Sequence, residues 1–346
     1  MKFRTEYIPS PADRPLDPEQ PVVLLGSCFT RSIGEKMQQS LWRAWVNPTG
    51  VLYNPLSIAR VLEAAIADDY STSRIVEDSL VSSSEMWVSW LADSTATTGS
   101  RADTAALLTS RLKLLADLID RAGALIVTLG TAWIYELREQ PGYIVANCHK
   151  FPSDTFTRRR LTPEEIAARW IPLAARLHKR NPQLRIIFTI SPIRHLKDGF
   201  EGNALSKAIL HLACDRLCQS IPAAEYFPSY EILTDDLRDY RFYAADLTHP
   251  SEEAVEYIWE KFQERYLTDA ARTLLREGEK VMKALSHRPI IACDIPEIRS
   301  RAEDFRRQAE ERYLDFIRRH PDMGIVPDTS APGVIIHNSM PVCEKK

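Results

Sequence analysis

Two small nucleophilic side chains, Ser27 and Cys28, follow an apolar run in the stretch PVVLLGSCFTR. Residues 22–25 predict a short buried strand that ends at Gly26, and residues 31–41 place apolar side chains at helical spacing. A strand, a tight turn that carries a nucleophile, and a helix form a recurrent catalytic arrangement, because the helix N-terminus supplies N–H groups for an oxyanion. The turn alone is weak support, so a matching base is needed elsewhere in the chain.

Asp246 and His249 provide such a base. A thiol or hydroxyl nucleophile needs a general base within hydrogen-bond reach, and that base needs a partner that orients it. The sequence Asp246-Leu247-Thr248-His249 lies just ahead of a helix that is predicted to begin at Ser251. Asp246 can then accept from Nδ1–H of His249 and leave Nε2 free for the nucleophile. The residues therefore predict an acyl-transfer site built from Cys28 or Ser27, His249 and Asp246.

Apolar runs that alternate with helical patterns must position these residues. The predicted strands cover residues 22–25, 124–130 and 185–192, and residues 224–233 predict either a fourth strand or an extended segment. The predicted helices after the first cover residues 56–67, 104–122, 162–179, 203–219 and 251–266. This alternation predicts an α/β fold, a three-layer sandwich around a mainly parallel sheet, in which the carboxyl ends of the strands share one ligand-binding edge.

Arg194 and His195 follow the strand predicted at 185–192, so they belong to that edge. A role in substrate binding and a role in structural pairing are equally open for both. The guanidinium of Arg194 would suit a carboxylate or a phosphate of a substrate.

The rest of the chain predicts appendages to a catalytic domain at residues 21–266. Residues 1–20 are polar and proline-rich, and they predict an extended arm with no secretory signal. Residues 267–319 predict a charged helical extension that would act as a lid or as the contact of a homo-oligomer. Residues 320–346 predict a mobile tail. Residues 70–100 predict a partly buried insertion, either a strand or a lid.

Composition excludes several classes of protein. The chain has 346 residues and a net charge of −3, which gives no general case for binding nucleic acid or an acidic membrane surface. No apolar window is long enough to span a bilayer. The six cysteines show no disulfide spacing, so we expect reduced thiols and a cytoplasmic location. His211, Cys214 and Cys218 have helical spacing, but their apolar neighbours favour a core helix over a metal site.

Seven segments, taken together, resemble a known family. They are GSCFT at 26–30, NPTGVLYNPLSI at 47–58, LGTAWIY at 129–135, NCHKFP at 147–152, SPIRH at 191–195, FPSYEI at 227–232 and DLTHPS at 246–251. Their order is similar to that of the GSCFA domain family, which itself resembles the SGNH, or GDSL-like, hydrolases and acyltransferases. The resemblance covers about residues 20–265. It implies an SGNH-hydrolase-like fold and a reaction at an ester bond.

The superfamily pattern also implies roles for single residues. Its register places Cys28 where the nucleophilic serine usually stands, while a one-residue shift in the turn would restore Ser27, so both stay candidates. The resemblance implies that the N–H groups of Cys28, Gly50 and Gly130 bind the oxyanion. The pattern departs at Trp133, which occupies the place of an asparagine that usually donates to the oxyanion. Further candidates for oxyanion or substrate binding are Asn54, Thr131, Asn147 and His149.

We therefore expect an esterase or an acyltransferase that acts on a small-molecule or carbohydrate ester, including an O-acetylated carbohydrate. No metal and no redox cofactor is expected, and acyl-CoA would be the co-substrate of a transferase. The alternative is a non-catalytic protein that binds a carbohydrate or an acyl ligand on a degenerate SGNH scaffold. The absent asparagine supports that alternative, and the retained Asp246–His249 pair opposes it.

Overall fold

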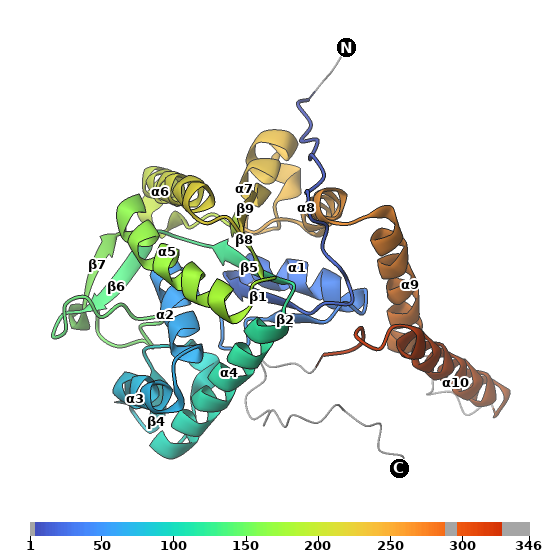
Figure 1. Ribbon diagram of the computed structural model, residues 1–346, viewed down its shortest axis with the longest axis horizontal. Helices are drawn as coiled ribbons and strands as arrows, with labels where there is room; N and C mark the ends of the chain where they lie inside the picture. The colour runs from blue at the N-terminus through green and yellow to red at the C-terminus, as the bar shows by residue number, and fades with distance from the viewer. Residues whose placement is uncertain (1–3, 288–295, 327–346) are drawn as a thin grey trace.

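A five-stranded parallel sheet forms the centre of the molecule (Figure 1). A computed structural model describes residues 4–287 and 296–326 of the chain. The strand order is β2-β1-β5-β8-β9, and each neighbouring pair is parallel. The strands are β1 (Val22–Gly26), β2 (Ala44–Val46), β5 (Ala124–Leu129), β8 (Arg185–Ile190) and β9 (Ala224–Phe227). The predicted three-layer α/β sandwich is confirmed.

Helices cover both faces of the sheet, so successive strand residues enter two different cores. In β1, Val23 and Leu25 belong to one buried cluster, and Val22 and Leu24 belong to the other. The first cluster includes side chains from α2 (Pro55–Ala65), α4 (Arg101–Arg121), α5 (Pro163–Arg180) and α6 (Gly199–Ser220). The second includes side chains from α1 (Cys28–Gln39) and α8 (Glu252–Tyr266). Burial on both faces explains why β1 and β5 read as continuous apolar runs.

Two antiparallel hairpins lie outside the central sheet. They are β3 (Leu80–Ser83) with β4 (Met86–Ser89), and β6 (Trp133–Leu137) with β7 (Phe156–Arg160). The insertion predicted at residues 70–100 contains nearly all of α3 (Asp69–Ser79), the first hairpin and the short helical segment Ser94–Ala96. Short helical segments lie at Ser94–Ala96, Ser153–Thr155, Leu196–Asp198, Ser229–Glu231 (α7), Ile232–Leu237 and Tyr240–Phe242.

The strand order reverses between β1 and β5. The chain goes from β1 to β2 on one side and returns to β5 on the other. Parallel α/β sheets bind ligands at such a switch point, outside the carboxyl ends of the strands. Gly26 ends β1 at this place with a φ of +140°, and a Cβ atom there would overlap the carbonyl oxygen of Thr128 in β5. Glycine therefore permits the close approach that brings Ser27 and Cys28 to the switch point.

The N-terminal arm packs along the end of α8. The N–H groups of Ala12 and Leu16 donate to the carbonyl oxygens of Arg265 and Tyr266, each at 2.7 Å. Leu16 is buried in the second core cluster. The predicted arm is therefore extended but held against the fold.

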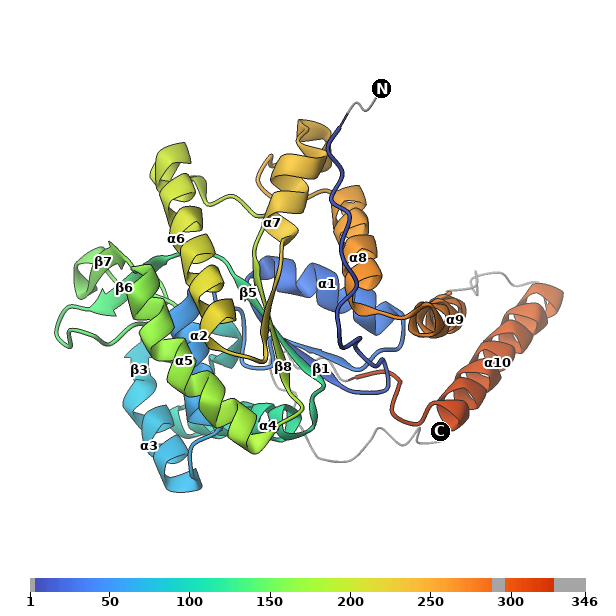
Figure 2. The ribbon, with the colours of Figure 1, turned by 45° about the horizontal axis from the view of Figure 1, so that its top comes forward.

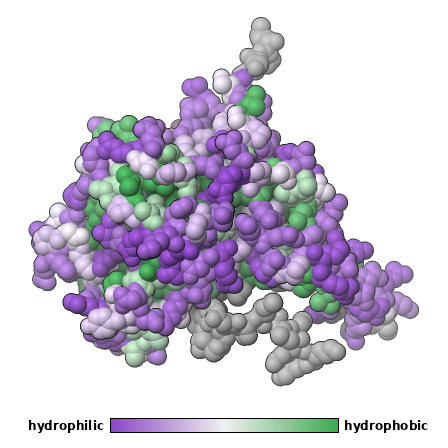
Figure 3. All heavy atoms as spheres, viewed as in Figure 1, coloured by the Kyte–Doolittle hydropathy of each residue, from purple (hydrophilic) through white to green (hydrophobic). Residues whose placement is uncertain are grey.

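The C-terminal extension begins with α9 (Asp269–Ser286), which docks on α1, and continues with α10 (Pro296–Arg319), which packs on α9 (Figure 2). Hydrophilic residues dominate the surface over α10 (Figure 3). Part of the predicted mobile tail is packed instead, since Met323 is buried and the Gly324 N–H donates to Leu41 O at 2.8 Å. The rest of that prediction, residues 327–346, lies outside the described residues. None of the helices in the described part of the chain is both long and apolar enough to cross a membrane.

Candidate active site

A cavity of about 520 Å³ lies at the carboxyl edge of the sheet, over the switch point. Segments that follow three strands meet there: Cys28 after β1, Thr131 after β5 and Arg194 after β8. Of the predicted site residues, those that line the cavity are Ser27, Cys28, Asn54, Thr131, Asn147, Arg194, His195 and His249. The structure thus brings together residues that are more than 200 positions apart in the chain.

The two candidate nucleophiles differ in access. Cys28 is the first residue of α1 and is half-buried, and its Sγ lies 3.3 Å from the hydroxyl of Tyr53. Ser27 is 1% exposed, and its Oγ is buried without a hydrogen-bond partner among the described residues. The Ser27 N–H donates to Thr128 O at 3.2 Å, which ties the turn to β5. The Cys28 thiol is therefore more accessible to a ligand in the cavity than the Ser27 hydroxyl is.

Asp246 and His249 form the expected pair. Asp246 Oδ2 lies 2.5 Å from His249 Nδ1, and Asp246 Oδ1 accepts the N–H groups of Thr248 and His249 at 2.9 Å each. These backbone donors, and then the imidazole, hold the pKa of the Asp246 carboxyl well below its usual range. Leu247 has a φ of +58° inside this turn, a conformation that L-residues seldom adopt. The carboxylate therefore fixes both the loop and the imidazole.

His249 and the two nucleophile candidates line the same cavity. Within residues 4–287 and 296–326, no hydrogen bond joins His249 to Cys28 or to Ser27. The His249 side chain is about half exposed, so its ring is accessible to a substrate in the cavity. In enzymes without bound substrate, catalytic hydrogen bonds are often long and tighten only when substrate arrives.

The N–H groups of Gly50 and Gly130, which the resemblance assigns to an oxyanion site, already have protein acceptors. The Gly50 N–H donates to Asn47 O at 2.8 Å, and Gly50 does not line the cavity. The N–H groups of Gly130 and Thr131 both donate to Tyr53 O, at 2.9 and 3.0 Å. These donors hold loops together and are not free for a substrate.

The asparagine and histidine candidates also make structural contacts. Asn54 caps α2 by accepting from the Ser57 N–H at 2.8 Å, and Asn147 Oδ1 accepts from the His149 N–H at 2.7 Å. His149 Nε2 lies 2.8 Å from Ser89 O, and burial lowers the pKa of this histidine. Because His149 does not line the cavity, the structure favours its structural role.

Arg194 and His195 face the cavity from the loop after β8. Arg194 N–H donates to Thr248 O at 3.2 Å, which joins this loop to the turn of His249. His195 packs edge-to-face on Tyr53, and its Nε2 is buried without a partner in the described structure. Burial, followed by the charges of Lys207 and His249, lowers the pKa of His195 to about 4. His195 is therefore neutral at pH 7.

Sequence reasoning missed the wall that the β6–β7 hairpin supplies. Trp133, Tyr135 and Arg158 come from this hairpin, and Lys197 and Asp198 face them from the loop after β8. Arg158 donates to both carboxylate oxygens of Asp198, at 2.5 and 2.6 Å. The segment GTAWIY and the run Arg158–Arg160 were visible in the sequence, but only the antiparallel pairing of the two strands turns them into a wall.

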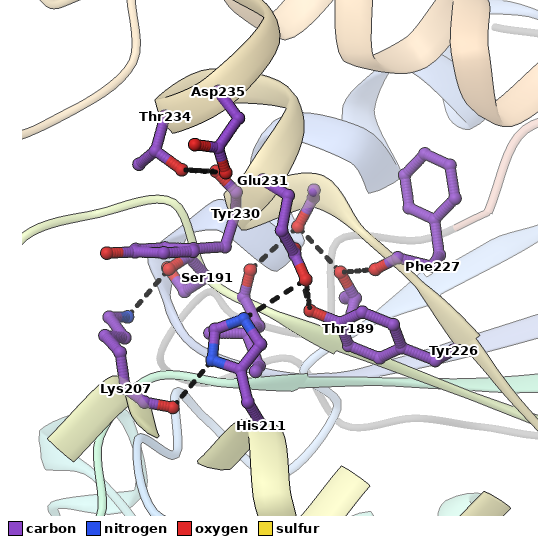
Figure 4. Close-up of polar contacts among 12 residues, drawn as sticks. Thr189, Ser191, Lys207, His211, Tyr226, Phe227, Tyr230, Glu231, Thr234 and Asp235 are labelled. Atoms are coloured by element: carbon purple, nitrogen blue, oxygen red, sulfur yellow. Dashed lines mark hydrogen bonds and ion pairs between the residues drawn. The ribbon is translucent and has the colours of Figure 1, made fainter. Parts of the chain in front are cut away.

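A buried lysine, Lys207, joins the ends of β5 and β8, and Figure 4 shows its hydrogen bond to Ser191 after β8. Lys207 of α6 donates to Ser191 O at 2.7 Å and to Gly130 O at 2.8 Å. Burial lowers the pKa of its ammonium group to about 7. Next to it, His211 lies between Lys207 O and the carboxylate of Glu231, at 2.8 and 3.1 Å. This network fixes the loops that carry Thr131 and Arg194.

The core-helix prediction for His211, Cys214 and Cys218 agrees with their surroundings. Cys214 is buried in the first core cluster, and Cys218 packs against that cluster. Throughout the described ranges, no group of three or more His, Cys, Asp or Glu side chains is arranged to hold a metal ion.

Fold and site together define a class: a parallel α/β sandwich with a cysteine at a helix N-terminus and an Asp–His pair in one switch-point cavity. The chain belongs to the GSCFA family, whose model matches residues 21–262. The predicted family is thereby confirmed, while the wider likeness to SGNH hydrolases stays a prediction. A search of the curated proteins found no match.

Proposed function

We propose that this protein is an esterase or an acyltransferase that uses Cys28 as its nucleophile. One observation carries the proposal: Cys28 and the Asp246-oriented His249 line the same cavity at the switch point of the sheet. Ser27 is the weaker candidate because its Oγ is covered.

The reaction needs two acyl transfers. Cys28 loses its proton to His249, and its sulfur forms a bond to the ester carbonyl carbon. The carbon–oxygen bond then breaks, and the leaving alcohol takes the proton back from His249. Water or an acceptor alcohol attacks the resulting thioester and gives its proton to His249. The thiolate that departs is then reprotonated, so the enzyme returns to its starting state.

Two hydrogen-bond donors, the N–H of Cys28 and the hydroxyl of Tyr53, support an oxyanion site. The N–H of Cys28 belongs to the first turn of α1, where N–H groups lack intrahelical acceptors. The Tyr53 hydroxyl lies 3.3 Å from Sγ, and burial, followed by the hydrogen bond with Cys28, raises the pKa of Tyr53 well above its usual range. The Tyr53 hydroxyl therefore keeps its proton at neutral pH. It would donate a hydrogen bond to the oxyanion in place of the N–H groups of Gly50 and Gly130.

No metal and no redox cofactor enters this scheme. In the cytoplasm, where we expect this protein, acyl-CoA would be a suitable donor for a transferase. A carbohydrate or small-molecule ester would be the substrate of a hydrolase.

The test is hydrolysis of 4-nitrophenyl acetate by the wild type, Cys28→Ala, Ser27→Ala and His249→Ala. We expect Cys28→Ala and His249→Ala to lose at least about 100-fold in kcat/KM, and Ser27→Ala to keep most activity. Cys148→Ser is the control for another thiol on the cavity wall. Full activity in Cys28→Ala would overturn the assignment.

A second candidate is a non-catalytic protein that binds a carbohydrate or an acyl ligand. The committed N–H groups of Gly50 and Gly130, and the absence of a bond between His249 and Cys28 among the described residues, favour it. Iodoacetamide labelling separates the two. Burial raises the pKa of Cys148 to about 11, so this thiol serves as the slow internal reference. Enhanced labelling of Cys28 that falls in His249→Ala supports an enzyme, and equal labelling of both cysteines supports a binding protein.

A further inference from the structure

The cavity wall carries more positive than negative charge. Its cations are Arg158, Arg194 and Lys197, and its one carboxylate is Asp198. Both carboxylate oxygens of Asp198 already accept hydrogen bonds from Nη1 and Nη2 of Arg158. His249 is a further basic group on the wall, and its Nδ1 is hydrogen-bonded to Asp246. Two cations therefore lack a carboxylate among the described residues, in a chain whose net charge is −3.

Arg194 is the better placed of these two cations. It is half-buried, and its guanidinium carbon lies 4.6 Å from the ring centre of Tyr243 and 5.8 Å from that of Tyr240. Aromatic stacking holds the plane of a guanidinium and leaves the N–H groups at its edge for an anion. Within the described ranges, the Arg194 side chain makes no hydrogen bond and no ion pair, so those N–H groups have no protein acceptor.

The position of Arg194 links an anion to the chemistry. Its N–H donates to Thr248 O, so it sits beside the turn that carries His249. Lys197 approaches from the same loop, and its Nζ donates to the Tyr135 hydroxyl at 2.9 Å. Trp133 and Tyr135 offer an apolar surface next to these charges.

We infer that the natural substrate is an anionic ester, with a carboxylate or phosphate that binds Arg194 and is assisted by Lys197. The placement of the reacting ester at Cys28 rests on the proposed function, while the anion site rests on the charges and contacts of the wall. The apolar surface of the hairpin would hold the part of the substrate between the anion and the ester.

A binding measurement tests the anion site without catalysis. Inorganic phosphate and succinate are titrated separately into the full chain by calorimetry, with neutral dimethyl succinate as the reference. We expect at least one anion to bind and the reference not to bind. Arg194→Gln should weaken binding by about tenfold or more, and Lys197→Gln by less, since charge-assisted hydrogen bonds are lost. Arg176→Gln, an exposed arginine on α5, is the matched control and should change nothing.

The choice of anion identifies the group that the substrate carries. Preference for phosphate indicates a phosphorylated ester, and preference for succinate indicates a carboxylate. Binding of neither anion, or equal binding by wild type and Arg194→Gln, overturns the inference. Because Lys197 is exposed, Lys197→Gln remains informative even where Arg194→Gln fails to fold.

A kinetic comparison separates this inference from the proposed function. The ratio of kcat/KM for 4-nitrophenyl hydrogen succinate to that for 4-nitrophenyl acetate should exceed about ten in the wild type and fall toward one in Arg194→Gln. Turnover with no preference for charge contradicts the anion site alone. A wild-type protein that binds the anion through Arg194 but hydrolyses neither ester contradicts the proposed function alone.

Discussion

Tyr53 is the side chain that defines the surroundings of Cys28. Its hydroxyl is in contact with Sγ, its ring packs on His195, and its carbonyl oxygen accepts from Gly130 and Thr131. One residue, just before the N-cap of α2, thus links the ends of β1, β5 and β8. The hydroxyl and the ring are separable, because phenylalanine keeps the packing.

Tyr53→Phe should lower kcat/KM for a neutral ester by about tenfold, since it removes one hydrogen-bond donor near the oxyanion. The free energy of unfolding should change by less than about 1.5 kcal/mol. Tyr70→Phe is the control, because the Tyr70 side chain is exposed far from the cavity wall. Unchanged kinetics in Tyr53→Phe would leave the Cys28 N–H as the main oxyanion donor.

At the scale of elements, the carboxyl ends of β5 and β8 are held by Lys207. Its folded-state pKa of about 7 lies below the ordinary value of 10.5. The buried charge therefore costs stability below pH 7. The cost is relieved between about pH 7 and pH 10, where the folded lysine has lost its proton and the unfolded lysine has kept it.

Lys207→Met removes this titration. We expect the stability of the wild type, relative to Lys207→Met, to rise with pH above 7 by up to about 1.4 kcal/mol per unit. Urea unfolding at several pH values measures it. Parallel stability curves for the two proteins would show that Lys207 keeps its charge across this range.

Strands with apolar runs could be predicted from the sequence, whereas β2 and the pairing of β6 with β7 could not. The strand predicted within residues 224–233 is β9, which ends at Phe227 and is followed by α7. β1, β5 and β8 are buried on both faces, so the segments VVLL, ALIVTL and RIIFTI are mostly apolar. β2 has three residues, which is too few for a pattern. β6 and β7 are separated by a long loop, and their pairing depends on contacts that single-strand patterns do not encode.

The candidate site also contains some residues that could be predicted from the sequence and others that could not. The contact of Asp246 with His249 and the position of Cys28 after β1 could be predicted because both depend on local spacing. Tyr53, Lys197 and Lys207 could not, since their roles arise where separate loops meet. The acceptors of the Gly50 and Gly130 N–H groups could not be predicted, because a resemblance transfers chain positions but does not show which N–H groups the loops already use.

At the scale of the whole molecule, the helices after residue 267 extend the sandwich beyond the matched family region. α9 contributes Leu275 and Val281 to the same core as α1 and α8. A homo-oligomer through α9 and α10 remains a prediction that sedimentation of the full chain would test.

Gly278 is the point where α9 meets the fold, because a Cβ atom there would overlap the carbonyl oxygen of Ser40. Gly278→Ala should therefore destabilise the protein by about 1–3 kcal/mol, as overpacking does. In an undocked helix the same change would stabilise by up to about 1 kcal/mol, because alanine favours helix over glycine. The sign of the change in the free energy of unfolding thus reports whether α9 is docked.

The central claim, that Cys28 receives the acyl group, is tested most directly by trapping the intermediate. The full chain is mixed with 4-nitrophenyl acetate, quenched in acid and mapped by mass spectrometry, with Ser27→Ala and His249→Ala in parallel. If Cys28 is the nucleophile, we expect one acetyl group on the Cys28 peptide in the wild type and in Ser27→Ala. Acetylation should be much slower in His249→Ala. Acetyl on Ser27, or turnover of the ester with Cys28 unmodified, would contradict it.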